Sequence, residues 1–252
     1  MSHHQGPDTG RVERMDIAGV PLAVRSGGDP ADRPVVFWHP LGDVTSGAYL
    51  SELAPALTSR GLRLVAPDGP GFVASPPLPP EQYAVQRLAE LVWGLVAALG
   101  LARPVLMGHS WGGVVMLAAA ADRPDLLRQI QDDVRRPLTA AYIAGLEPAM
   151  RQTSTGAFEP VVTARTRAAA QHGMLLERSL LHWPTLATAE VPELLLLATE
   201  PRAGAPGQRG GRPRGALRAD VHFLPGWGHD LVADGGPELA AIIGDWLSQR
   251  RP

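Results

Sequence analysis

Short apolar runs alternate with longer amphipathic stretches along most of the 252-residue chain, and this alternation constrains the fold more than any other feature. Runs apolar on both faces are typical of central strands in a parallel sheet, whereas apolar residues at helical spacing indicate helices that cover it. The expected strands are Pro34–Pro40, Leu62–Asp68, Arg103–His109, Pro192–Thr199 and Asp220–Gly226. The expected helices are Tyr49–Ser59, Tyr83–Leu99, Gly112–Ala121 and Pro237–Arg250. The sequence predicts an α/β fold with a mostly parallel central sheet flanked by helices.

The chain length and the ends of the pattern predict a single domain. Residues 1–10 are polar and are expected to be a disordered tail, followed by a hairpin of Arg14–Ile17 and Leu22–Arg25. A chain of this size can bury one core, so residues 11–252 are expected to form one domain.

Two internal regions depart from the alternation. Residues 122–190 are loosely helical and polar, with one candidate strand at Thr139–Leu146, and we expect a short helical cap to be inserted there. Residues 201–215 consist mostly of Gly, Pro and Arg, a composition typical of a flexible loop.

Composition excludes several classes of function. The formal net charge is −2 and like charges do not cluster, which argues against nucleic-acid or membrane-surface binding and favours a small-molecule substrate. The absence of cysteine excludes thiolate nucleophiles and cysteine-ligated metals. Neither a signal peptide nor a membrane span is evident, so a cytoplasmic protein is expected. Oligomeric state is not indicated.

The segment Gly108-His109-Ser110-Trp111-Gly112 places a serine between two glycines directly after an apolar run. A strand that turns at once into a helix strains the residue at the turn, and its neighbours must be small because strand and helix pass close together. The turn would expose the Ser110 hydroxyl at a helix N-terminus, where free N–H groups and the helix dipole favour negative charge.

This segment and three others resemble motifs of the α/β-hydrolase fold family, in its serine-nucleophile branch. The resemblance extends over roughly Val12–Leu247, and the four motifs occur in the family's order, each after an expected strand. They are GHSWGG around Ser110, FWHPLG (Phe37–Gly42), APDGPGFVAS (Ala66–Ser75) and LPGWGHDLV (Leu224–Val232).

The resemblance implies a role for particular residues. Ser110 would be the nucleophile and His229, in a glycine-rich turn after the last strand, the base that accepts its proton. The backbone N–H groups of Leu41 and Trp111 would form the oxyanion hole. Pro40 stands where the family usually has glycine, so this chain departs from the family in the loop that bears Leu41. Neither a cofactor nor a metal is expected.

The carboxylate that would orient His229 is less well marked. The family places it after the strand that follows the cap, where this chain has Glu200, or one strand earlier. For the earlier position the candidate strand offers Glu147, and a stretch that we interpret as helical offers Asp132 and Asp133. Glu200 is the preferred candidate.

These residues predict a serine hydrolase that cleaves a small, largely apolar ester, lactone or thioester through an acyl-enzyme. One alternative is a non-hydrolytic biosynthetic enzyme on the same fold, such as a lyase, cyclase or acyltransferase. Another is a catalytically inactive binding protein, although binding alone requires neither Ser110 nor His229.

Overall fold

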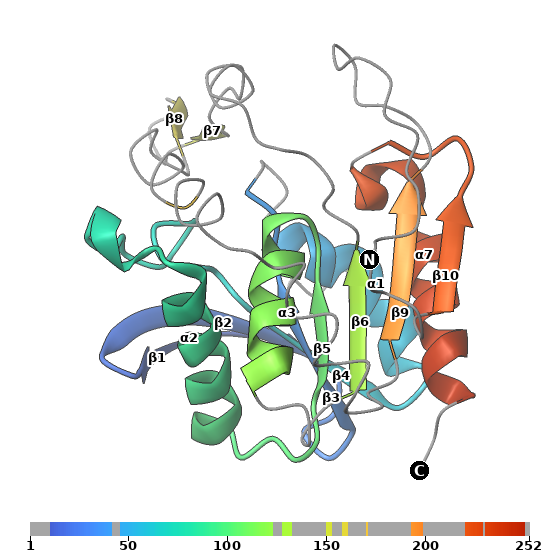
Figure 1. Cartoon of the computed structure of the whole chain (residues 1–252), viewed down its shortest axis with the longest axis horizontal. Coiled ribbons are helices and arrows are strands. Elements are labelled where there is room, and N and C mark those ends of the chain that lie inside the picture. Colours follow the sequence, from blue (N-terminus) through green and yellow to red (C-terminus); the bar gives the residue numbers. More distant parts are fainter. Residues whose placement is uncertain are drawn as a thin grey trace, which may run out of the picture.

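Eight strands form one sheet in the computed structural model of the chain (Figure 1). The structure describes residues 11–41, 46–122, 128–132, 150–152, 158–160, 170, 193–198, 220–228 and 230–249. Across the sheet the strands are β1 (Arg11–Ile17), β2 (Val20–Gly27), β4 (Leu62–Pro67), β3 (Arg33–Trp38), β5 (Val105–Gly108), β6 (Arg128–Asp132), β9 (Glu193–Ala198) and β10 (Asp220–Leu224).

The sheet is parallel except at its N-terminal edge. β1 and β2 form an antiparallel hairpin, and β2 also pairs antiparallel with β4. Every pair from β4 to β10 is parallel. The hairpin turns at Ala18 and Gly19, which have φ of 52° and 79°. Because six strands run the same way, their carboxyl ends meet at one edge, where α/β folds place their ligands.

Helices cover both faces of this sheet (Figure 1). One core cluster joins the strands to α1 (Ser46–Thr58) and α7 (Leu231–Ser248). A second cluster, on the other face, contains α2 (Val85–Ala98) and α3 (Trp111–Asp122). A single 3-10 turn, Pro80–Gln82, precedes α2. No helix among the described residues is both long and apolar enough to cross a membrane.

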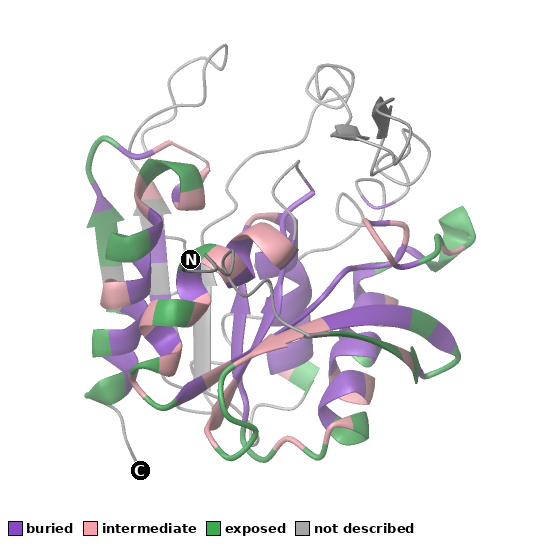
Figure 2. Cartoon of the chain, turned by 180° about the vertical axis from the view of Figure 1, so that it is seen from behind, coloured by how far each residue is buried: buried purple, intermediate pink, exposed green. Residues whose placement is uncertain are grey.

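Burial follows the pattern that the sequence predicts. Figure 2 shows the central strands and the inner sides of the helices buried, with exposure concentrated on the outer helix surfaces and edges. Val35, Val36, Phe37 and Trp38 in β3 are all buried, as a strand covered by helices on both sides requires. The predicted mostly parallel sheet flanked by helices is confirmed.

The region after α3 corrects one expectation. The stretch around Asp132, which we interpreted as helical, contains β6, and its Asp132 pairs with Leu196 of β9 inside the main sheet. Farther along, β7 (Met150–Gln152) and β8 (Phe158–Pro160) form a separate two-stranded antiparallel sheet. The candidate strand Thr139–Leu146 lies outside the described residues, and the helical cap stays a prediction.

The backbone of α3 packs very closely against the ends of β5 and β3. A Cβ added to Gly108 would lie 2.3 Å from the carbonyl oxygen of Gly112, in the first turn of α3. A Cβ added to Gly112 would lie 1.9 Å from the carbonyl oxygen of Trp38 and 2.8 Å from that of His39. These contacts are with backbone atoms that cannot rotate away. Glycine at both positions is therefore required by packing.

We predict that Gly112→Ala lowers the free energy of unfolding by more than about 4 kcal/mol, because the added methyl group must displace β3 from α3. Gly47→Ala, in α1, is the matched control, because the three atoms nearest its added Cβ all belong to the Arg25 side chain, at the ordinary contact distance of 3.7–3.8 Å. That control should change stability by between zero and about +1 kcal/mol, owing to helix propensity. Denaturant unfolding measures both, and similar small effects in the two variants would contradict the packing argument.

Candidate active site

Ser110 occupies the turn that joins β5 to α3. Its φ is 56°, a left-handed conformation that non-glycine residues rarely adopt. The turn is closed by a hydrogen bond from the Gly112 N–H to the His109 carbonyl at 2.8 Å. Ser110 is half-buried. The strained strand-to-helix turn that the sequence predicts is thus confirmed, and such strain is typical of functional sites.

The loop that follows β3 begins beside this turn. The carbonyl groups of Trp38 and His39 contact Gly112, which places the segment bearing Pro40 and Leu41 close to the N-terminus of α3. Leu41 is 6% exposed and packs in the core cluster on the α3 face. The free N–H groups of a helix's first turn point out of its N-terminus. Leu41, which follows His39 in this loop, and Trp111, which begins α3, thus belong to segments that are adjacent in the fold.

The buried imidazole of His39 connects this loop to the segment after β4. Its Nε2 lies 2.9 Å from the backbone N of Gly69, and its Nδ1 lies 2.7 Å from the carbonyl oxygen of Pro40. Because an amide N–H can only donate, Nε2 accepts and Nδ1–H donates, so the ring is neutral. Pro40, which lacks an N–H, contributes its carbonyl to this bridge.

Burial lowers the pKa of the His39 imidazole, because the charged ring would lose its hydration. The bond to the Pro40 carbonyl and the charge of Asp68 act in the opposite direction but are the weaker causes. The lowered pKa agrees with the neutral ring that the hydrogen bonds require.

A second buried polar residue, Asp68, ties its own loop to β2 and α1. Arg25 of β2 donates to both of its oxygens at 3.2–3.3 Å, and Ser46 Oγ of α1 lies 2.7 Å from Oδ1. The Ser75 hydroxyl donates to the Asp68 carbonyl at 2.6 Å and accepts from the Ala23 N–H at 2.9 Å. Asp68 thus organises its own loop. Arg25 and Ser46 carry no local sequence signal of this contact.

An aromatic group lies against the turn at Ser110 between β5 and α3, hereafter the elbow. The Trp111 ring stacks on Phe72 with centroids 5.4 Å apart, and His39 contacts both rings. Trp38 meets Trp111 edge-on at 6.1 Å. The buried indole N–H groups of Trp38 and Trp111 have no hydrogen-bond partner within the part of the chain that the structure describes. The face of the elbow toward α3 is therefore largely apolar.

His229 itself lies outside the described residues, but both sides of its turn are described. The connection follows β10 and turns at Gly226, whose φ is 82°. The Gly228 N–H donates to the Asp234 carboxylate at 2.7 Å. Asp230 is the N-cap of α7, and its carboxylate accepts from the Ala233 N–H at 3.3 Å. The turn is therefore anchored at the carboxyl-end edge of the sheet, which also bears Ser110.

The four candidate acids differ in their position relative to the described strands. Asp132 is the last residue of β6, so it ends a strand at the same edge as Ser110 and is not the helical residue we expected. Glu200 follows the end of β9 by two positions. Glu147, Asp133 and Glu200 lie outside the described residues, and the choice among the four carboxylates stays a prediction.

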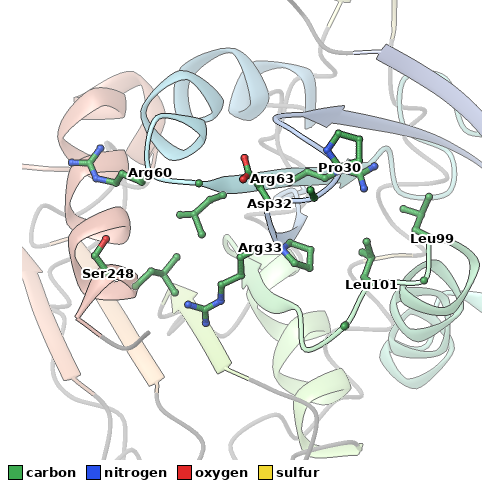
Figure 3. Close-up of a pocket in the computed structure, with 15 residues that line it drawn as sticks. Pro30, Asp32, Arg33, Arg60, Arg63, Leu99, Leu101 and Ser248 are labelled. Atoms are coloured by element: carbon green, nitrogen blue, oxygen red, sulfur yellow. The ribbon is translucent and has the colours of Figure 1, made fainter. Parts of the chain in front are cut away.

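A hollow of about 780 Å³ lies at the opposite end of the sheet, where β3 and β4 begin (Figure 3). Its lining includes Arg33, Arg60 and Arg63, but in Figure 3 the side chains of Arg60 and Arg63 point to opposite sides. Arg60 donates to the Ala56 carbonyl at 2.9 Å and to Asp245 of α7 at 3.2 Å. The hollow is thus separate from the elbow, and its guanidinium groups do not converge.

Comparisons with known proteins point to one fold. Residues 33–130 match a family model described as alpha/beta hydrolase fold. The solved structure of E-2-(acetamidomethylene)succinate hydrolase is similar with a TM-score of 0.75 at 18% identity, over 94% of this chain and 99% of that one.

Two curated relatives match shorter stretches. The magnesium-chelatase 30 kDa subunit of Rhodobacter capsulatus is 34% identical over 96 residues, which are 38% of this chain and 33% of that protein. Epoxide hydrolase A of Mycobacterium tuberculosis is 35% identical over 108 residues, 42% of this chain and 33% of that protein. The chain thus matches about a third of the length of each.

The neutral His39 predicts a pH dependence of stability. Its folded pKa lies below the ordinary value of about 6.5, so below that pH the unfolded chain binds a proton that the folded chain does not. The free energy of unfolding should therefore fall with decreasing pH below about 6.5, by up to about 1.4 kcal/mol per pH unit from this group. Urea unfolding between pH 5 and 8 measures the slope.

His39→Gln should flatten that slope, whereas His222→Gln, at an exposed position of β10, should leave it unchanged. An unaltered slope in His39→Gln would contradict a neutral His39.

Proposed function

We propose that the chain, which has the α/β-hydrolase fold, is a serine hydrolase that cleaves a small, largely apolar ester, lactone or thioester through an acyl-enzyme. The observation that carries the proposal is Ser110 at φ 56° between β5 and α3. A strained serine at a helix N-terminus is the arrangement that presents a hydroxyl nucleophile in this fold. A serine that served only to fill space in the core would not need this strained backbone conformation.

In the first half of the proposed reaction, Ser110 Oγ attacks the substrate carbonyl carbon. His229 takes the hydroxyl proton as the new C–O bond forms, and the carbonyl electron pair moves onto oxygen. When the tetrahedral intermediate collapses, the bond to the leaving alkoxide or thiolate breaks, and His229 gives that group its proton. An acyl ester on Ser110 remains.

In the second half, water attacks the acyl ester. His229 accepts one proton from the water, the tetrahedral intermediate forms again, and its collapse returns the proton to Ser110 Oγ. The carboxylic acid leaves, and no cofactor enters either half of the cycle.

The oxyanion formed in both halves would be bound by the backbone N–H groups of Leu41 and Trp111. Trp111 begins α3, so its N–H lies at the positive end of the helix dipole. Pro40 does not remove a required donor, because the donor is the next residue. The His39 bridge to Gly69 and Pro40 supports the proposal by fixing the loop before the reaction starts.

The strand order favours Glu200 as the acid partner of His229. β9 is hydrogen-bonded to β10 in parallel, so both strands end at the same edge of the sheet, and in the sequence Glu200 comes two positions after the end of β9 and His229 five positions after the end of β10. Asp132 ends β6, which is one strand farther from β10. The acid and the base need direct contact, because the carboxylate fixes the tautomer of the imidazole.

A serine at the elbow also argues against chemistry of the epoxide-hydrolase type. An aspartate nucleophile forms an ester with the alkyl carbon of its substrate, and the elbow of this chain holds no carboxylate. Acyl transfer to a hydroxyl is the reaction that the residue supports.

We predict that an alkyl fluorophosphonate adds one equivalent to the wild-type protein and none to Ser110→Ala, as measured by intact mass. Ester turnover in Ser110→Ala should fall about 10⁴- to 10⁶-fold, the range for loss of a triad member. Ser248→Ala is the matched control, since it removes a hydroxyl that donates within α7, to the Gly244 carbonyl at 2.8 Å. Labelling of Ser110→Ala would overturn the assignment.

For the carboxylate we predict that Glu200→Gln lowers ester turnover by about 10⁴-fold, as loss of tautomer control requires. His229→Ala gives the loss of ester turnover that removal of the base causes, for comparison. Asp132→Asn and Glu147→Gln should retain most activity, with circular dichroism checking that each variant is folded. A large loss in either of these two, with Glu200→Gln still active, would place the acid one strand earlier.

A further inference from the structure

The nucleophile elbow is held from both faces of the sheet. On the α3 side, Gly112 packs against the end of β3. On the α1 side, the hydroxyl of Tyr49 hydrogen-bonds Nδ1 of His109, the residue directly before Ser110. Tyr49 is 1% exposed and His109 3%. The Tyr49 ring also packs against Phe37 of β3, with centroids 4.3 Å apart, so it has little freedom to move.

His109 is therefore fixed through three of its groups. Its backbone N–H donates to the Trp38 carbonyl at 3.3 Å, its carbonyl accepts from the Gly112 N–H at 2.8 Å, and its ring is bonded to Tyr49. The peptide between residues 109 and 110 sets the direction in which the Ser110 side chain leaves the backbone. A left-handed serine persists only where its surroundings over-determine the backbone.

We propose that Tyr49 is a positioning residue for the nucleophile: its hydroxyl holds the His109 ring and thereby keeps Ser110 aimed at the substrate carbonyl. The inference rests on the proposed function, in which Ser110 attacks. Tyr49 touches neither substrate nor reacting atoms in this scheme. Its effect is on alignment, and misplacement of a reacting group by about 1 Å can cost ~100-fold in rate.

The location of the pair makes this role specific to the elbow. Tyr49 lies in α1, on the face of the sheet opposite Trp111 and the loop at Phe72. Loss of its hydroxyl would leave the packing of that other face in place. Substrate binding should be affected less than the chemical step.

The test compares Tyr49→Phe with Tyr83→Phe. Both remove a buried phenol hydroxyl; that of Tyr83 donates to the Pro70 carbonyl at 3.0 Å and accepts from the Leu78 N–H at 3.2 Å. The readouts are the second-order rate constant for fluorophosphonate labelling, kcat and KM for one ester, and the melting temperature. We expect Tyr49→Phe to slow labelling and lower kcat by about tenfold or more, with KM within about twofold.

Tyr83→Phe should lower the melting temperature yet leave the labelling rate within about twofold of wild type. In a His109→Leu background, Tyr49→Phe should have almost no further effect on labelling, because the hydroxyl has lost its partner. If Tyr49→Phe lowers only the melting temperature, its bond is merely structural and the inference is wrong. If the wild-type protein is not labelled at all, the proposed function fails as well.

Discussion

The contact between the first turn of α3 and the end of β3 is the constraint on which the site depends. No side chain takes part in it: the α-carbon of Gly112 faces the Trp38 carbonyl so closely that a methyl group would lie 1.9 Å from that oxygen. Because backbone meets backbone, the geometry cannot relax through a rotamer. It forces Ser110 into the left-handed region and sets the loop bearing Leu41 next to the helix N-terminus. This one backbone contact thus produces both the exposed hydroxyl of Ser110 and the surroundings of the proposed oxyanion hole.

Two buried polar groups then hold the loops around this contact. The neutral His39 ring joins the segment after β3 to the segment after β4, and the Asp68 carboxylate joins the latter segment to β2 and α1. Both groups are almost completely removed from water, so each is stable only while its hydrogen bonds are complete. The segments that carry His39, Pro40, Asp68 and Gly69 are therefore held in place before any substrate arrives, as preorganised catalysis requires.

The parts of this arrangement that the sequence predicts are those set by local chemistry. Glycines at 108 and 112 indicate the elbow because they are needed within one turn of it, and uninterrupted apolar runs indicate β3 and β5 because those strands are covered on both faces. β6 has one apolar residue, Ile130, in its five positions, and its place in the sheet comes from pairing with β5 and β9. The Tyr49–His109 and Arg25–Asp68 contacts join residues 60 and 43 positions apart, and no local pattern marks them.

The central claim is that the elbow places Ser110 Oγ within reach of two backbone donors. A crystal structure of the protein after reaction with a fluorophosphonate measures this directly, because the phosphonyl oxygen occupies the position of the oxyanion. We expect a covalent bond from phosphorus to Ser110 Oγ, with the phosphonyl oxygen about 2.7–3.1 Å from the backbone nitrogens of Leu41 and Trp111. An adduct on another residue, or an oxygen turned away from both nitrogens, would contradict that claim.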